Sequence, residues 1–178
     1  KTMALLKLLQ NYGNSYRGLT SLREAMAQSM NVIAVKTLND VSPKIGYDYL
    51  LNLGFTTLVD NYTSQDGKTY TDISLPLALG GLTKGVTNLE LTNGFATIAN
   101  QGLYHPAFFY TKIVDHDGNV LLDNTMNTDT RQVMKESTAW LLTSAMEDVI
   151  LKGTGSRLKF KKINMPQAGK TGTSTGNR

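Results

Sequence analysis

Near its end the chain reads Gln167-Ala-Gly-Lys-Thr-Gly-Thr-Ser174, a lysine set among glycines and hydroxyl side chains. As a phosphate-binding loop, it would present backbone N–H groups and Lys170 to phosphate oxygens, but the glycine that should open that motif is Asn164. As an edge strand, it would alternate its side chains, so that the Thr171 and Thr173 hydroxyls face a ligand together. An ordinary Gly/Thr-rich strand and turn explains the same letters, so the stretch alone leaves three interpretations open.

Composition indicates one packed domain that we place over residues 1–178. The chain has 178 residues, 40% of them hydrophobic, and no apolar run reaches the ~20 residues that span a bilayer. A net charge of +4 with 8% aromatic residues does not indicate a nucleic-acid partner. The absence of cysteine excludes disulfides, thiolate metal sites and cysteine nucleophiles.

No pattern predicts a metal or another cofactor. Asp115 and Asp117 do not open a calcium loop, because Val120 stands where the sixth-position glycine is required. His105 and His116 lack the further ligand pair of a zinc site. The Asp-Gly within residues 115–119 instead predicts a hairpin turn.

Caps and apolar spacing predict four helical regions. The first region begins at Ser21 and is interrupted at Ser29–Asn31, and the second begins at Pro43 with a helix over about 44–53. The third begins at Thr87, and the fourth extends from about Lys135 to about Lys152. The helical spacing of Leu91, Phe95 and Ile98 predicts that the helix beginning at Thr87 buries the face that carries these three residues.

Alternation and turn residues predict the strands. They cover residues 108–114 and 120–122 around the hairpin turn, 157–163 with one basic face, and 168–174. Residues 56–71 are polar and rich in Gly, Asn and Asp, which predicts a long loop.

The break between the first two helical patterns contains Ser29-Met30-Asn31, the one Ser-x-Asn of the sequence. A polar break between helices can project side chains into a cleft. Taken alone, the same three residues are explained by Asn31 as a helix cap with a serine beside it. The choice depends on what else the sequence contains.

An ordered series of motifs surrounds the two triplets. It comprises Gly18–Asn31 with Ala34-Val35, Leu75–Gly81, Gly85–Glu90, Ala99–Gly102, Gly153–Gly155 and Ala168–Thr173. In this order the series closely resembles the transpeptidase domain of penicillin-binding proteins, of the bifunctional class A type. The resemblance extends from about Tyr12 to Asn177.

The resemblance implies an α+β fold of the penicillin-binding and serine beta-lactamase kind, with an antiparallel sheet flanked by helices. Such enzymes carry their nucleophile in a Ser-x-x-Lys that precedes Ser-x-Asn, and nothing before Ser29 fits it. We reject Ser156, because the motif Ser156-Arg-Leu-Lys159 follows Ser29 and falls on the predicted basic strand over 157–163 rather than at the start of a helix. We therefore expect a partial transpeptidase domain whose nucleophile lies outside this chain, as does the strand that should follow Lys-Thr-Gly.

The resemblance also implies a role for each matching residue. Ser29 would relay a proton to the leaving nitrogen, and Asn31 would bind the substrate amide. Lys170 would supply positive potential to the Ser29 hydroxyl and to the substrate carboxylate, and the Thr171 and Thr173 hydroxyls would bind that carboxylate.

In the same substrate-binding segment, Gly172 would allow close approach of the ligand. The Thr173 backbone N–H would form half of an oxyanion hole.

The implied activity is D,D-transpeptidation of peptidoglycan stem peptides through a serine acyl-enzyme, which beta-lactams would also acylate. The expected partners are these peptides, beta-lactams and the rest of the domain, at the extracellular face of the bacterial cytoplasmic membrane with an anchor outside this chain. A serine beta-lactamase remains an alternative, although 141 residues separate Ser29 from Lys170. A non-catalytic acyl-binding relative and, less favoured, a nucleotide-binding loop protein also remain.

Overall fold

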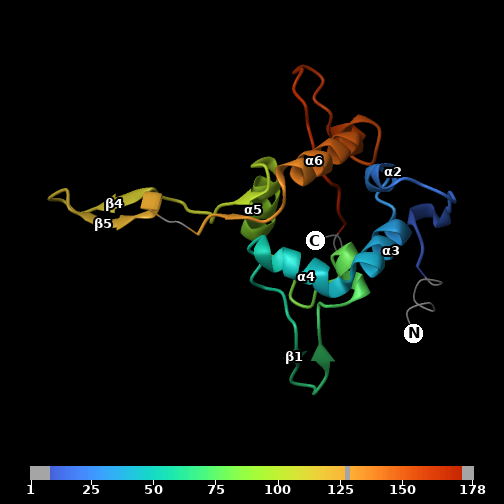
Figure 1. Ribbon diagram of the computed structural model, residues 1–178, viewed down its shortest axis with the longest axis horizontal. Helices are drawn as coiled ribbons and strands as arrows, with labels where there is room; N and C mark the ends of the chain where they lie inside the picture. Colours follow the sequence, from blue (N-terminus) through green and yellow to red (C-terminus); the bar gives the residue numbers. More distant parts are fainter. Residues whose placement is uncertain (1–8, 127–128, 174–178) are drawn as a thin grey trace.

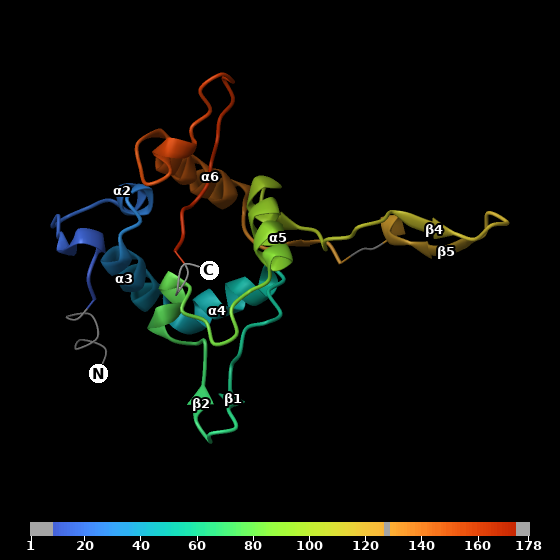
Figure 2. The same ribbon diagram turned by 180° about the vertical axis from the view of Figure 1, so that it is seen from behind.

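The computed structural model describes residues 9–126 and 129–173 and shows helices arranged around the C-terminal segment (Figures 1 and 2). The helices and 3₁₀ turns are η1 (Tyr12–Asn14), α2 (Leu22–Ala27), α3 (Asn31–Val41), α4 (Pro43–Asn52), η2 (Leu75–Leu79), α5 (Asn88–Ala99), η3 (Asn124–Met126), α6 (Glu136–Leu151) and η4 (Ser156–Leu158). The four predicted helical regions are therefore confirmed. No helix in the described ranges combines the length and apolar character needed to cross a bilayer.

Helix α2 lies against α6. The Ser21 hydroxyl accepts the Glu24 N–H at 3.2 Å, as its predicted cap requires. From the first turn of α2, the Arg23 guanidinium donates to the Ser144 carbonyl at 2.8 Å and pairs with Asp148 at 3.3 Å. The first turn of α2 is thereby held against the second half of α6.

The main apolar core lies between α4, η2 and the loop that joins them. Its buried members are Tyr47, Phe55, Leu58 and Leu77. The same loop carries Asp72, which is 1% exposed. Burial alone would raise the pKa of Asp72, but hydrogen bonds from Val59 N–H and from the N–H and hydroxyl of Thr83 lower it.

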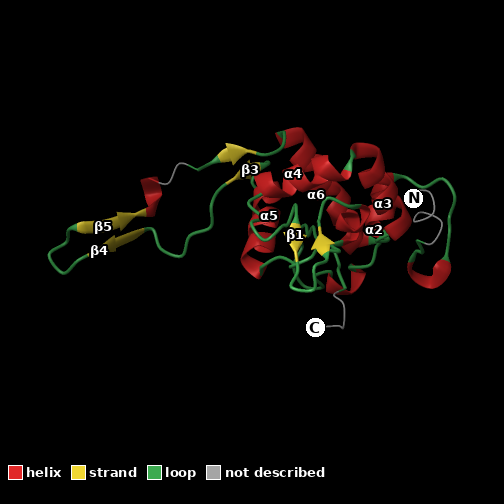
Figure 3. Cartoon of the chain, turned by 90° about the horizontal axis from the view of Figure 1, so that it is seen from below, coloured by secondary structure: helices red, strands yellow, loops and turns green. Residues whose placement is uncertain are grey.

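The strands form antiparallel pairs, so the α+β class is confirmed, although within the described residues the pairs do not join into one sheet. They are β1 (Tyr62–Thr63) with β2 (Thr69–Tyr70), β3 (Leu103–Tyr104) with β6 (Arg131–Gln132), and β4 (Lys112–Val114) with β5 (Val120–Asp123). The predicted hairpin is β4–β5, which projects far from the helices (Figure 3). The predicted loop over 56–71 contains the short β1–β2 hairpin.

Helix α5 does not bury the predicted face. Leu91 and Phe95 are 44% and 39% exposed, whereas Gly94 and Thr97 are buried. A Cβ on Gly94 would lie 3.2 Å from the Phe55 ring. The helix therefore approaches the core through small residues, because close approach requires a position without a side chain.

The predicted strand over 157–163 is wrong. Ser156–Leu158 is a 3₁₀ turn, and the Gln167 side chain bonds the Phe160 N–H at 2.7 Å and the Leu158 carbonyl at 3.3 Å. Gln167 thus satisfies backbone groups that a neighbouring strand would otherwise satisfy.

The predicted strand over 168–174 also forms no ladder in its described part, residues 168–173, because no other described strand lies beside it. Ser174 lies outside the described residues.

Candidate active site

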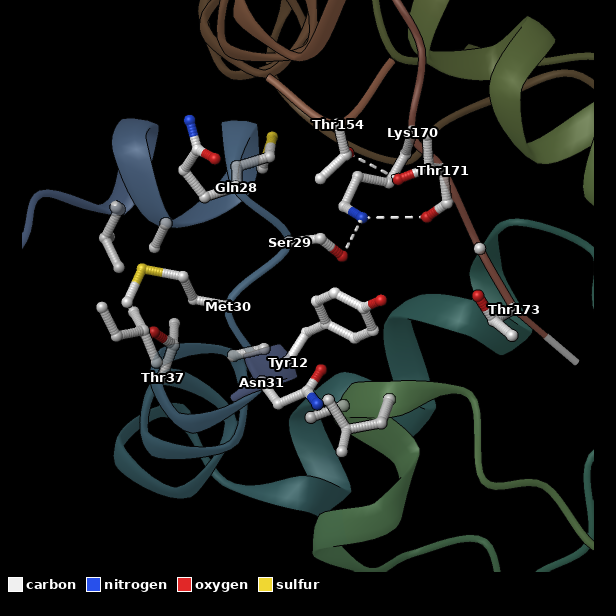
Figure 4. Close-up of a pocket in the computed structure, with 18 residues that line it drawn as sticks. Tyr12, Gln28, Ser29, Met30, Asn31, Thr37, Thr154, Lys170, Thr171 and Thr173 are labelled. Carbon is white, nitrogen blue, oxygen red and sulfur yellow. Dashed lines mark hydrogen bonds between the residues drawn. The ribbon is translucent and has the colours of Figure 1, made fainter. Parts of the chain in front are cut away.

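A cavity of about 1000 Å³ lies between the α2–α3 junction and the C-terminal segment (Figure 4). The residues predicted from the sequence that line it are Ser29, Asn31, Lys170, Thr171, Gly172 and Thr173. They come from two parts of the chain that are 141 residues apart. The fold therefore gathers all six on one cavity.

The backbone at the end of α2 places Ser29 in an unusual conformation. Its N–H donates to the Met26 carbonyl at 3.1 Å, and the Met30 N–H donates to the Ala25 carbonyl at 2.9 Å. This is the Schellman pattern, in which the residue after the helix is left-handed and usually glycine. Ser29 occupies that position with φ 53°. A serine here stores backbone strain and carries a hydroxyl to the cavity wall.

Lys170 faces Ser29 directly. Its Nζ donates to Ser29 Oγ at 2.7 Å and to the Thr171 carbonyl at 2.9 Å. Two of its three donors are thus used, and none of the ion pairs found among the described residues involves it. Desolvation by the surrounding protein lowers the pKa of Lys170 below its usual value. The cavity therefore presents an amine that can attract an anion and exchange a proton with Ser29.

Thr154 is a site residue that was not predicted from the sequence. Its hydroxyl lies 2.6 Å from that of Thr171, and its N–H donates to the Ala27 carbonyl at 3.0 Å. A Cβ on Gly153 would lie 2.1 Å from the same carbonyl oxygen, so only glycine fits there. The signal available in the sequence is the Gly153–Gly155 motif, which belongs to the motif series and contains Thr154.

Comparison with known proteins identifies the family. The penicillin-binding protein transpeptidase domain matches residues 7–177. The chain belongs to this family. The resemblance inferred from the motif series is thereby confirmed.

Relatives of this transpeptidase domain are much longer than the chain. Penicillin-binding protein 1F of Bacillus subtilis is 32% identical over 166 residues, which are 93% of this chain and 21% of that protein. Penicillin-binding protein 4 of the same organism is 35% identical over 166 residues, 93% of this chain and 24% of that protein. The chain thus spans about a fifth to a quarter of the length of these curated relatives.

A solved structure shares the fold of this domain. The penicillin-binding protein PonA1 from Mycobacterium tuberculosis matches with a TM-score of 0.71 and 25% identity, over 93% of this chain and 43% of that one. The structure of PonA1 in complex with penicillin V matches with a TM-score of 0.66 and 24% identity, over 80% and 38% of the two chains.

Within this transpeptidase domain, Asn31 does not cap α3, so the alternative interpretation of the triplet as a helix cap is wrong. The N-cap position is Met30, and Asn31 is the first helical residue. The Asn31 Nδ2 donates instead to the Gln10 carbonyl at 3.2 Å. Its carboxamide is therefore free of capping and lies on the cavity.

The other sequence candidates are placed as follows. Thr173 lies apart from the bonded Ser29–Lys170 pair (Figure 4), and a Cβ on Gly172 would meet nothing within 4 Å. Ser156 is not among the residues that line the cavity.

The nucleotide-binding loop is not formed in the transpeptidase domain, because no helix begins between Lys170 and the last described residue, Thr173. Among the described residues there is also no cluster of three or more His, Cys, Asp or Glu side chains that could hold a metal.

Proposed function

We propose that this chain supplies one wall of the active site of a serine D,D-transpeptidase, and that the nucleophilic serine lies in a part of the polypeptide outside residues 1–178. One observation carries the proposal. The Lys-Thr-Gly lysine and the Ser-x-Asn serine, which are distant in sequence, share a 2.7 Å hydrogen bond on a cavity of ligand size.

Acyl transfer needs a proton route for the leaving group. The nucleophilic hydroxyl attacks the carbonyl between the two D-alanines of a stem peptide, and the carbon–nitrogen bond breaks. The departing D-alanine amine must receive a proton, which the Ser29 hydroxyl can deliver because it donates and accepts at once. Lys170 can then replace that proton through its bond to Ser29 Oγ, and the proton that the nucleophilic hydroxyl loses on attack restores the ammonium of Lys170.

Binding the terminal carboxylate is the second requirement. This carboxylate can accept a charged hydrogen bond from the Lys170 ammonium and neutral hydrogen bonds from the Thr171 and Thr173 hydroxyls. The Asn31 carboxamide would hold the substrate amide, and the Thr173 N–H would supply one of two donors to the developing oxyanion. Gly172 leaves room for the ligand backbone.

The second half-reaction restores the enzyme. An amine of a neighbouring stem peptide attacks the acyl-enzyme, which forms the cross-link and releases the serine. A beta-lactam would acylate the same serine, in line with the penicillin V complex of the relative PonA1. This activity places the protein at the extracellular face of the bacterial cytoplasmic membrane, held by an anchor outside this chain.

Labelling with a fluorescent penicillin tests the proposal. The full-length polypeptide that contains these residues should form a stable adduct, and the isolated 178-residue chain should form none. Mass spectrometry of the digested adduct should place it on a serine upstream of Lys1. An adduct on Ser29 or Ser156, or no adduct on the full-length protein, would contradict the proposal, and rapid release of the acyl group would favour a beta-lactamase.

A further inference from the structure

Helix α3 begins beside the candidate active site without a capping side chain of its own. The first N–H groups of a helix have no intrahelical acceptor and are usually satisfied by a Ser, Thr, Asp or Asn at the N-cap. Here the N-cap is Met30, whose thioether makes no capping bond. A second segment must therefore supply the acceptor.

Asn11 supplies it from a position 21 residues upstream. Its Oδ1 accepts the Val32 N–H at 3.1 Å, which is the bond that an N-cap side chain would make. The residue is 7% exposed, and its Nδ2 donates to the Ser15 carbonyl at 2.9 Å. Both ends of this buried carboxamide are thus satisfied.

The segment that carries Asn11 is a closed turn. The Asn14 N–H donates to the Asn11 carbonyl at 3.0 Å, which forms η1, and the Tyr16 hydroxyl donates to the Leu9 carbonyl at 3.2 Å. These bonds close the turn, and the bond from Asn11 Nδ2 to the Ser15 carbonyl fixes the Asn11 side chain within it. The Asn11 side chain therefore loses conformational entropy through contacts within the turn as well as through its bond to α3.

The residue next to Asn11 orients Asn31. A carbonyl oxygen can only accept, so the group that faces Gln10 must be the Asn31 NH₂. The Asn31 Oδ1 and its second N–H are left for the cavity. Asn11 and Gln10 together fix both the start of α3 and the direction in which Asn31 presents its carboxamide.

We infer that Asn11 is a positioning residue for the active site, because it caps α3 from outside and thereby holds Ser29 and Asn31 in place. This inference rests on the proposed transpeptidase function for its catalytic readout. Misplacement of reacting groups by about an ångström costs up to a hundredfold in rate. Loss of the Asn11 bonds should therefore slow acylation more than it unfolds the protein.

The test is a series of Asn11 variants of the full-length protein, with the rate constant for acylation by a fluorescent penicillin measured per folded molecule. Asn11→Leu removes both bonds and should acylate about ten- to a hundredfold more slowly. Asn11→Asp keeps the acceptor for the Val32 N–H, with a charge that suits a helix N-terminus, but loses the donor to the Ser15 carbonyl, so its acylation rate should lie between those of Asn11→Leu and wild type. Asn11→Ser, which is too short to span the gap, serves in place of Asn11→Leu if that variant does not fold.

Asn93→Leu is the matched control, because Asn93 also bonds a distant backbone carbonyl, that of His105 at 3.0 Å, but lies on α5. It should acylate at the wild-type rate per folded molecule.

The inference is overturned if Asn11→Leu or Asn11→Ser acylates at the wild-type rate, or if Asn11→Asp is as slow as Asn11→Leu. If the wild-type protein does not react with penicillin, the proposed function fails. Hydrogen exchange then decides the inference: the Val32 amide should exchange at least tenfold faster in Asn11→Leu, and an unchanged rate overturns it.

Discussion

At the scale of the residue, Ser29 combines a strained backbone with a hydroxyl that accepts a hydrogen bond from Lys170. Its φ of 53° is one that glycine adopts without cost and that serine adopts against steric resistance. Glycine is the residue usually found at the left-handed position of a Schellman motif, which Ser29 occupies after α2. A serine at this position is therefore better explained by its bond to Lys170 than by the stability of the helix end.

Replacing Ser29 with Gly should separate stability from chemistry. We expect Ser29→Gly to leave the free energy of unfolding unchanged or raise it by up to about 1 kcal/mol, because the left-handed strain is relieved. The same change should slow acylation by about 10²–10⁴, as loss of a proton-relay group does. The measurements are thermal unfolding and penicillin acylation of the full-length variant.

Two results would count against this account of Ser29. One is a Ser29→Gly protein that acylates at the normal rate, which would make the hydroxyl dispensable. The other is a large loss of stability, which would mean that the serine supports the helix break rather than the reaction.

At the scale of the element, the contact between α2 and the turn after α6 sets the distance between the two site segments. Gly153 packs against the Ala27 carbonyl, and Thr154 bonds the same oxygen at 3.0 Å. The Thr154 hydroxyl then reaches Thr171. One turn thus connects the segment that carries Ser29 with the segment that carries Lys170.

We expect Gly153→Ala to disrupt this connection. The added methyl group would lie 2.1 Å from the Ala27 carbonyl oxygen, so backbone must move, at a cost of about 1–3 kcal/mol. The melting temperature should fall and acylation should slow at least tenfold. Gly169→Ala is the control, because its Cβ would meet only Ile150 at 3.9 Å, and it should behave as wild type. Equal acylation rates in the two variants would show that the turn does not position the site.

Helix α5 is tied to the core loop by the carboxylate of Glu90, which makes stability depend on pH. It accepts from the N–H and hydroxyl groups of both Thr87 and Thr56. These bonds, the Thr87 backbone bond first, lower the pKa of Glu90 to about 2. A depressed pKa stabilises the fold above the unfolded value of 4.5, and this stabilisation is lost as the pH falls from 4.5 toward 2.

Glu90→Gln should therefore melt at a lower temperature than wild type at pH 7, because Gln cannot accept all these bonds. The difference should narrow as the pH falls below 4.5, because the unfolded wild-type chain then binds a proton at Glu90 that the folded protein does not bind until the pH approaches 2. Melting curves of both proteins between pH 7 and pH 3 measure this. A difference that is constant across this range would assign the effect to packing alone.

Elements with local signals were predictable, and those that need a distant partner were not. The caps at Ser21 and Thr87 act within one helical turn, so their helices start where the sequence indicates. A strand is defined by a neighbour, and the alternating residues 157–163 have none in the described structure. Two of their backbone groups, the Phe160 N–H and the Leu158 carbonyl, instead form hydrogen bonds with the Gln167 side chain.

At the scale of the whole molecule, the order of the motifs predicted which residues meet in one cavity. Ser29 and Lys170 were paired by resemblance, and the structure brings them into contact. Thr154 and Asn11 could not be assigned in this way, because their roles depend on side-chain bonds across 17 and 21 residues that no periodicity encodes. Capping at a distance and hydroxyl pairing are consequences of tertiary packing.

The most direct test of the central claim is a double-mutant cycle between Ser29 and Lys170, read as the acylation rate constant of the full-length protein. Each of Ser29→Ala and Lys170→Ala should slow acylation at least tenfold, and their melting temperatures should stay close to wild type. Because the two side chains act through one hydrogen bond, the double variant should be about as slow as the slower single variant. Effects that multiply in the double variant, or single variants that acylate at the wild-type rate, would contradict the assignment of this pair as the proton-transfer centre of a transpeptidase.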